Sequence, residues 1–231
     1  MEFLQILYES VILIVTFDYE LYQIILLSLK TSGFATIIAS FFGIISAYLL
    51  TIYHFRLRKI VIVTFSSLMG IPPVVVGLIV YFIFTSNGPL GIFKILYTPM
   101  AMIIAQVIIV YPIITTLSRE IFAQFYYQHK DQMRSFNFSN LATIYTIIKN
   151  TYYILFSIIL SGFGRAISEV GAVMIVGGNI EHYTRIMTTA ISLETSMGNL
   201  EKALSLGIIL ILLTVFINGF VYSYNNKINN N

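Results

Sequence analysis

Cysteine is absent from the sequence, which excludes disulfides, thiolate zinc sites and cysteine nucleophiles. Charged residues are scarce: they make up 10% of the 231 residues, against about 25% in an ordinary soluble domain. Hydrophobic residues make up 58%, and the formal net charge is only +3. Such a composition excludes a disordered chain, a nucleic-acid-binding module and most soluble enzymes, and it indicates a protein surrounded by membrane lipid.

Several catalytic motifs are missing as well. The sequence has no Gly-x-x-x-x-Gly-Lys phosphate loop, so this chain should not hydrolyse ATP itself. It has no Gly-x-Ser-x-Gly elbow and no His-Glu-x-x-His zinc motif. The three histidines, His54, His129 and His182, fall at span ends or in loops far apart in the sequence. We therefore predict no catalytic residue, no metal site and no cofactor.

Long apolar runs predict membrane-spanning helices, because about 20 apolar residues cross the hydrocarbon core. Four runs qualify directly, and a fifth is apolar but interrupted by Arg165 and Glu169. The five expected spans are residues 31–53, 60–85, 98–117, 152–176 and 203–224. Residues 3–17 are apolar but short and contain Glu9, so we interpret them as an interfacial helix rather than a sixth span. The expected fold class is an all-α integral membrane protein, with residues 1–231 as a single domain.

The first expected span carries small residues three or four positions apart, which places them on one helical face. They are Ser28, Ser32, Ala35, Ala39, Gly43 and Ser46. A face of small residues lets two helices approach closely in lipid. We interpret it as a packing face, with the lining of a path as the alternative.

The basic residues set the expected direction of the spans, since cytoplasmic loops are enriched in Lys and Arg. With the N-terminus outside, eight basic residues fall inside and four fall outside or at that boundary. The eight inside residues are Arg56, Arg58, Lys59, Arg119, Lys130, Arg134, Lys149 and Lys227. We therefore expect the N-terminus outside, the C-terminus in the cytoplasm, and residues 118–151 as the largest cytoplasmic segment.

Residues 118–151 are expected to form a helix–turn–helix. Residues 119–136 have helical spacing, Asn137 tolerates the left-handed conformation, and Ser139 can cap a second helix that runs to about Ile148. Such an amphipathic hairpin is either a docking element for a cytoplasmic partner or an interfacial helix on the inner leaflet. The spacing alone leaves both interpretations open.

Two interruptions of the apolar spans are candidate pore or bundle sites. Pro72 and Pro73 remove two backbone donors in the second span, and a kink for a transport site and a kink for packing are equally favoured. Arg165 and Glu169 lie four residues apart on one helical face and can pair, with Ser168 beside them. We favour a structural ion pair that fixes the bundle over a polar lining of a path. We therefore expect Glu169→Gln to be more harmful than the double change Arg165→Gln/Glu169→Gln, because a lone buried charge is costly.

Several segments beyond residue 25 resemble the successive spans of oxyanion permeases. They are Ser28-Leu-Lys30, Ile71-Pro-Pro-Val-Val-Val-Gly77 with Asn87-Gly-Pro-Leu-Gly91, and Ala105-Gln106 through Tyr111-Pro112. The run Gly-Phe-Gly-Arg-Ala-Ile-Ser-Glu-Val-Gly-Ala-Val-Met-Ile-Val-Gly-Gly-Asn-Ile over residues 162–180 is similar to tungstate-type permeases, as is Thr184-Arg-Ile-Met-Thr-Thr-Ala190. The chain thus resembles the permease subunits of type I ABC importers of the tungstate, molybdate and sulfate group.

This resemblance implies a MetI-like fold and a homodimer with a pore at its axis. It also implies two partners, a cytoplasmic ABC ATPase and an extracytoplasmic oxyanion-binding protein, and a tungstate cargo, with molybdate and sulfate as alternatives. Transport would proceed by alternating access. The rival hypothesis is an ion-coupled secondary transporter that uses Arg165 and Glu169 as a charge relay.

The resemblance also implies which residues couple the chain to the ATPase. The Glu-Ala-Ala segment of the family falls at Asp131, Gln132 and Met133, and its glycine falls at Asn137. Residues 138–147 would then form the coupling helix. The implied coupling residues are Asp131, Gln132, Met133, Asn137, Phe138, Ser139, Leu141, Ala142, Ile144 and Tyr145.

Overall fold

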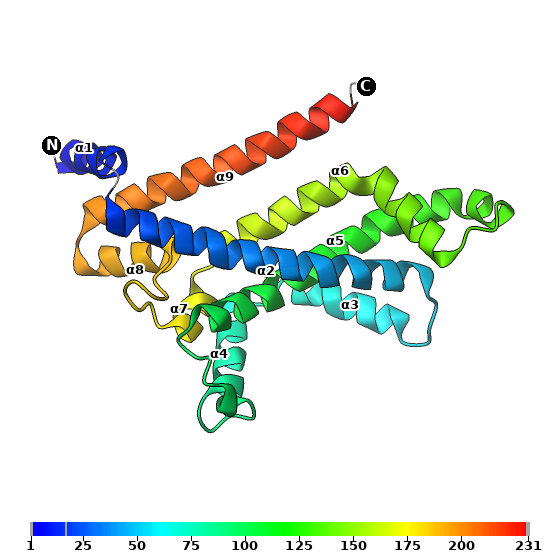
Figure 1. Ribbon diagram of the computed structural model, residues 1–231, viewed down its shortest axis with the longest axis horizontal. Coiled ribbons are helices and arrows are strands. Elements are labelled where there is room, and N and C mark those ends of the chain that lie inside the picture. The colour runs from blue at the N-terminus through cyan, green and yellow to red at the C-terminus, as the bar shows by residue number, and fades with distance from the viewer. Residues whose placement is uncertain (1, 17, 230–231) are drawn as a thin grey trace.

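The computed structural model describes residues 2–16 and 18–229, with side chains described from residue 6 to residue 219 of these ranges. Every regular element in the described residues is helical (Figure 1). The helices are α1 (Glu2–Val15), α2 (Tyr19–Ile52), α3 (Arg58–Leu68), α4 (Pro73–Phe84), η1 (Gly91–Phe93), α5 (Pro99–Ser135), α6 (Asn140–Ile167), α7 (Gly171–Gly177), α8 (Met187–Met197) and α9 (Leu200–Asn229). Four of them are long and apolar enough to cross a membrane, and the count is five if the bent pair α3 and α4 is one span. The expected all-α membrane fold with about five spans is confirmed.

Helices α2 and α5 form the centre of the bundle and run side by side along the long axis of the molecule (Figure 1). The small residues predicted on one face of α2 are buried from Ser28 to Gly43. A Cβ atom added to Gly43 would lie 2.9 Å from Cγ2 of Ile114 on α5. The backbones approach closely because small residues leave room for the larger side chains opposite, as the packing interpretation predicted.

Helix α2 begins well before the apolar run that marked the first span. Asp18 caps its N-terminus by accepting a hydrogen bond from the backbone N–H of Leu21 at 2.9 Å. With 34 residues the helix is about 51 Å long, which exceeds the roughly 30 Å of a hydrocarbon core. The apolar run therefore predicted only the later part of α2, from residue 31 onwards.

Helix α1 corresponds to the helix expected over residues 3–17, of which residue 17 lies outside the described residues. It packs against the start of α9 (Figure 1). The Ser10 hydroxyl donates to the Glu201 carbonyl at 3.0 Å, and the Ser205 hydroxyl donates to the Ser10 carbonyl at 3.2 Å. These contacts tie α1 to the bundle, while its predicted place at the membrane interface stays a prediction.

The second expected span is broken, as the two prolines predicted. Helix α3 ends at Leu68, α4 begins at Pro73, and the two differ in direction by 106°. Pro72 occupies the N-cap in an extended conformation and Pro73 the first turn, where no backbone N–H is needed. As a result, α4 projects sideways from the bundle (Figure 1).

The fourth expected span differs from the prediction at both ends. Helix α6 starts at Asn140, so the short helix expected to end near Ile148 and the span expected from residue 152 are one helix of 28 residues. The polar residues 149–151 suggested a boundary, but they include no glycine or proline and are compatible with a continuous helix. At the other end α6 stops at Ile167, and the short helix α7 follows from Gly171.

Helix α4, which follows the break after α3, and helix α7, which follows the end of α6, pack against each other with their backbones in close contact. A Cβ atom on Gly77 of α4 would lie 2.8 Å from Cα of Ala172 on α7. A Cβ atom on Gly171 would lie 2.6 Å from Cγ2 of Val74. Only glycine fits at these two positions, so α4 and α7 form one tightly packed unit.

This contact predicts the effect of Gly77→Ala. The new methyl group would meet the backbone of α7 and force the two helices apart, at a cost of about 1–3 kcal/mol of stability. Thermal unfolding of the purified chain in detergent would show a lower melting temperature. Gly33→Ala on α2 is the control, because no atom lies within 4 Å of the added Cβ. A Gly77→Ala chain that melts like the wild type would contradict the close approach.

Candidate functional site

The break between α6 and α7 holds the predicted ion pair. Glu169 follows the last turn of α6 and is 4% exposed, and its Oε2 lies 3.6 Å from Nη2 of Arg165. The other carboxylate oxygen accepts a hydrogen bond from the backbone N–H of Ala172 at 3.3 Å. The pair predicted from the sequence is therefore present, but it joins the end of one helix to the start of the next.

Three side chains satisfy backbone groups around this break. The Thr188 hydroxyl on α8 donates to the Glu169 carbonyl at 2.7 Å. The amide of Gln106 on α5 donates to the Ala166 carbonyl at 3.0 Å and to the Ser32 hydroxyl at 3.2 Å. Together with Glu169 itself, these contacts hold the break in one geometry.

Gln106 is a residue whose role sequence reasoning missed. It is fully buried and joins α2, α5 and the end of α6. Its sequence position could have indicated this role, because Gln106 is a single amide side chain inside the apolar run of residues 98–117. Polar side chains inside a membrane protein form hydrogen bonds with other helices. Its partners, however, could not be read from the sequence.

The structure brings the two groups of pore or bundle candidates close together. Val74, next to Pro73, touches Gly171, two residues beyond Glu169. On α6, Ser161, Arg165 and Ser168 are exposed in the single chain, at spacings of four and three residues. Charged groups at membrane depth face a protein interior or a water-filled cavity rather than lipid. This polar face of α6 (Ser161, Arg165 and Ser168) is the candidate lining of a path.

The unequal burial of the ion pair predicts which of the two single substitutions destabilises the chain more. Arg165→Gln leaves the buried Glu169 charge without its partner, whereas Glu169→Gln leaves an arginine that is 41% exposed and still reaches polar surroundings. We therefore expect Arg165→Gln to lower the free energy of unfolding more than Glu169→Gln does, by about 1–3 kcal/mol. The double variant Arg165→Gln/Glu169→Gln should regain part of the stability lost in Arg165→Gln. Thermal unfolding of the four proteins in detergent measures this cycle. Additive losses in the double variant would contradict the pairing.

The expected helix–turn–helix is present at the far end of α5 and α6, and we call it the hairpin (residues 119–148). Asn137 adopts the left-handed conformation with φ of 50°, and the Ser139 hydroxyl accepts a hydrogen bond from the Ala142 N–H at 3.2 Å. Both predicted roles are confirmed. The hydroxyl of Tyr48 on α2 donates to the Asn140 carbonyl at 2.9 Å, which ties the hairpin to the bundle.

The predicted coupling residues divide into exposed and buried groups. Leu141 is 80% exposed and Tyr145 is 65% exposed, and Phe136, which was not predicted, is 75% exposed. Together with the half-exposed Phe138 we call these residues the hairpin tip. Asp131, Gln132, Asn137 and Ser139 are also exposed, and Ala142 and Ile144 are partly buried. Met133 is buried against Phe122 and Ile147, so it stabilises the hairpin from inside and offers no surface to a partner.

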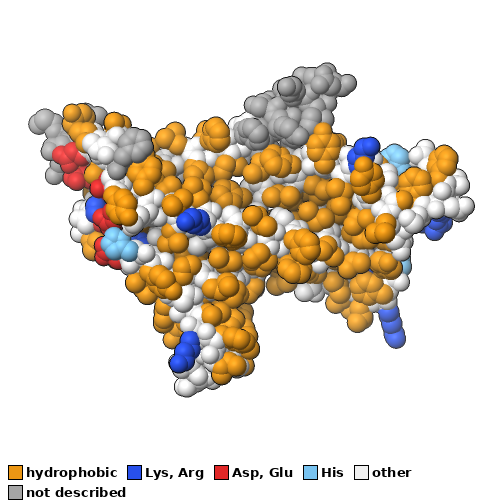
Figure 2. Space-filling view, viewed as in Figure 1, with side chains coloured by type: hydrophobic (Ala, Val, Ile, Leu, Met, Phe, Trp, Pro, Cys, Tyr) orange, Lys and Arg blue, Asp and Glu red, His pale blue; other side chains and the backbone are white. Residues whose placement is uncertain are grey.

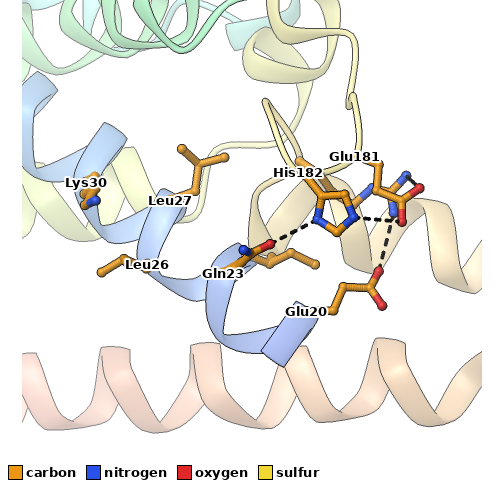
Figure 3. Close-up of a pocket in the computed structure, with 9 residues that line it drawn as sticks. Glu20, Gln23, Leu26, Leu27, Lys30, Glu181 and His182 are labelled. Atoms are coloured by element: carbon orange, nitrogen blue, oxygen red, sulfur yellow. Dashed lines mark hydrogen bonds and ion pairs between the residues drawn. The ribbon is translucent and has the colours of Figure 1, made fainter. Parts of the chain in front are cut away.

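A pocket of about 200 Å³ lies at the opposite end of the molecule, between the start of α2 and the loop before α8 (Figure 3). Its charged and polar lining residues are Glu20, Gln23, Lys30, Glu181, His182 and Arg185. Arg185 lies 3.9 Å from Glu20 and 3.8 Å from Glu181, and Nδ1 of His182 lies 3.0 Å from the Gln23 side-chain oxygen. The contacts of Arg185 and His182 with Glu20 and Gln23 fix the loop to α2.

These features define a multi-span membrane protein with a polar helix face, a broken span and a projecting hairpin, which are the features of a permease. Residues 39–230 match the family described as the binding-protein-dependent transport system inner membrane component, and the chain belongs to that family. The resemblance read from the sequence is thereby confirmed.

Three curated relatives cover nearly the whole chain. The tungstate uptake system permease protein TupB of Peptoclostridium acidaminophilum is 40% identical over 93% of this chain and 94% of its own length. The protein of the same name from Campylobacter jejuni is 33% identical over 91% and 88%. A probable anion ABC transporter permease protein of Haloferax volcanii is 34% identical over 90% and 91%.

Proposed function

We infer that this chain is the permease subunit of an ATP-driven ABC importer and that tungstate is its cargo. The observation that carries this conclusion is the 40% identity to a tungstate uptake permease over 93% of the chain. Relatives named for sulfate transport are 21–27% identical, and one named for molybdate/tungstate transport is 29% identical. Both relatives named for tungstate uptake are more similar to the chain than these.

The distribution of charge supports an orientation in the inner membrane with the N-terminus outside. Acidic side chains gather at the α1 and α8 end of the molecule (Figure 2). The opposite end carries Arg56, Arg58, Lys59 and the basic residues of the hairpin. By the positive-inside rule the hairpin then faces the cytoplasm, and the pocket lined by Glu20 and His182 faces outside.

The exposed hairpin tip supports docking to a separate ATPase subunit. Helix α5 continues for 16 residues beyond Arg119, which carries the tip about 24 Å further along the axis of the bundle (Figure 1). Most residues of α5 beyond Arg119 are polar, so the tip lies beyond the apolar part of the span. A cluster of exposed Phe, Leu and Tyr side chains in water indicates a protein partner.

Helix α6 offers a direct mechanical path between the tip and the polar face. Its 28 residues extend about 42 Å without a break, from Asn140 at the tip to Ile167 beside Glu169. Closure of two ATPase subunits would push on the tip and move the other end of α6 as a rigid rod. Such a displacement at the break is the switch between outward- and inward-facing forms.

The polar face of α6 also supports a homodimer. Ser161, Arg165 and Ser168 have no cover within the single chain, and lipid is an unfavourable neighbour for a guanidinium group. A second copy related by a twofold axis would enclose these residues in a shared pathway. An extracytoplasmic binding protein would deliver the oxyanion at the opposite mouth.

Reconstitution tests the proposed function. Proteoliposomes that contain this chain, its ATPase and its binding protein should accumulate tungstate only when ATP is supplied. The ATPase must be necessary because this chain has no phosphate loop. The control omits the ATPase and imposes a proton or sodium gradient. Gradient-driven uptake in that control would instead support an ion-coupled carrier.

A single introduced cysteine tests both the orientation and the docking, because the chain has none of its own. Leu141→Cys should react with a membrane-impermeant maleimide in inverted vesicles but not in intact cells. The labelled chain should lose the ATPase in co-purification, since the adduct occupies the hairpin tip. Gln128→Cys, exposed on α5 away from the tip, is the matched control and should be labelled from the same side without loss of ATPase. Labelling of Leu141→Cys in intact cells would reverse the proposed orientation.

A further inference from the structure

A cleft of about 250 Å³ lies in the crook of the hairpin, beside the tip. Residues of α5, the turn, the start of α6 and the end of α2 line it, and they are Ile52, Tyr126, Lys130, Met133, Arg134, Asn137, Phe138, Asn140 and Thr143. On α6 the lining residues Asn140 and Thr143 alternate with the outward-facing Leu141 and Tyr145. The cleft shares Met133, Asn137 and Phe138 with the predicted coupling residues, whereas the exposed Leu141 and Tyr145 lie outside its lining.

Two cations in this cleft lack a counter-charge. Lys130 and Arg134 lie four residues apart on one face of α5, a spacing at which like charges repel. Within the described residues neither side chain forms an ion pair, and the lining includes no acidic residue. In the pocket at the opposite end, by contrast, Arg185 is paired with Glu20 and Glu181.

Uncharged hydrogen-bond donors surround the two cations. Asn137 and Asn140 contribute side-chain amides, and Tyr126 contributes a phenol hydroxyl. The Asn140 amide has only a long contact of 3.4 Å to the Tyr53 hydroxyl, so it is available to a stronger acceptor. Guanidinium, ammonium and amide donors around a small cavity match the oxygens of a multiply charged anion.

We propose that the cleft binds a tetrahedral oxyanion of the phosphate type, either free in solution or as a lipid headgroup. This site goes beyond the proposed transport function and does not rest on it. The anion would bridge Lys130 and Arg134 on α5 to Asn140 on α6. Asn140 is already held to α2 through its carbonyl and Tyr48, so the bound anion would stiffen the hairpin relative to the bundle.

Hydrogen exchange on the delipidated chain in detergent tests this proposal. Titration with inorganic phosphate, against chloride at equal ionic strength, should protect the backbone amides of residues 126–143 in a saturable way. Lys130→Gln/Arg134→Gln should weaken the apparent affinity at least about tenfold, since two charge-assisted contacts are lost. Lys149→Gln is the matched control, because Lys149 lies over the Tyr145 ring and outside the cleft.

The source of the oxyanion is decided in nanodiscs without phosphate in the buffer. Protection that appears with phosphatidylglycerol but not with phosphatidylcholine would identify a lipid headgroup, whereas protection by phosphate in detergent identifies a free anion. The absence of protection in the wild-type chain in both arms would overturn the proposal. Equal weakening by Lys149→Gln would also overturn it, because that result indicates general attraction to a basic hairpin.

Discussion

Hydrocarbon offers no hydrogen-bond partner to a peptide group, so each break in a spanning helix must be satisfied by the protein itself. In this chain the span of α3 and α4 is broken after Leu68, and α6 stops at Ile167 before the short helix α7. At the second break Gln106, Thr188 and Glu169 supply the hydrogen bonds. The need to satisfy these groups explains why polar side chains from α5 and α8 converge on one point in an otherwise apolar bundle.

The same constraint explains how α4 and α7 are placed. Each helix restarts after a break, and glycines at 77 and 171 let the two backbones touch. The packing also draws in Val76, Val80 and Val176, which are buried between these helices and α5. The segments that follow the two breaks are therefore joined in one structural unit.

Long helices connect this unit to the distant hairpin. Helices α5 and α6 both run without interruption from the bundle into the hairpin, and α5 continues through Pro112. The interior cluster of Phe122, Met133 and Ile147 fixes the two arms against each other and against Ala47 of α2. Helical backbone rather than flexible loops therefore connects the exposed tip to the polar face of α6.

The sequence by itself determined the membrane environment, the approximate number of spans, the break at Pro72 and Pro73, the turn at Asn137 and the cap at Ser139. Each of these follows from local chemistry: apolar length, missing backbone donors, left-handed tolerance and a side-chain acceptor. Only the tertiary structure decided that α6 continues through residues 149–151, that Gln106 joins three helices, and that Arg165 is exposed while Glu169 is buried. The reason is that burial and hydrogen-bond partners depend on neighbours far away in the chain, which no local pattern records.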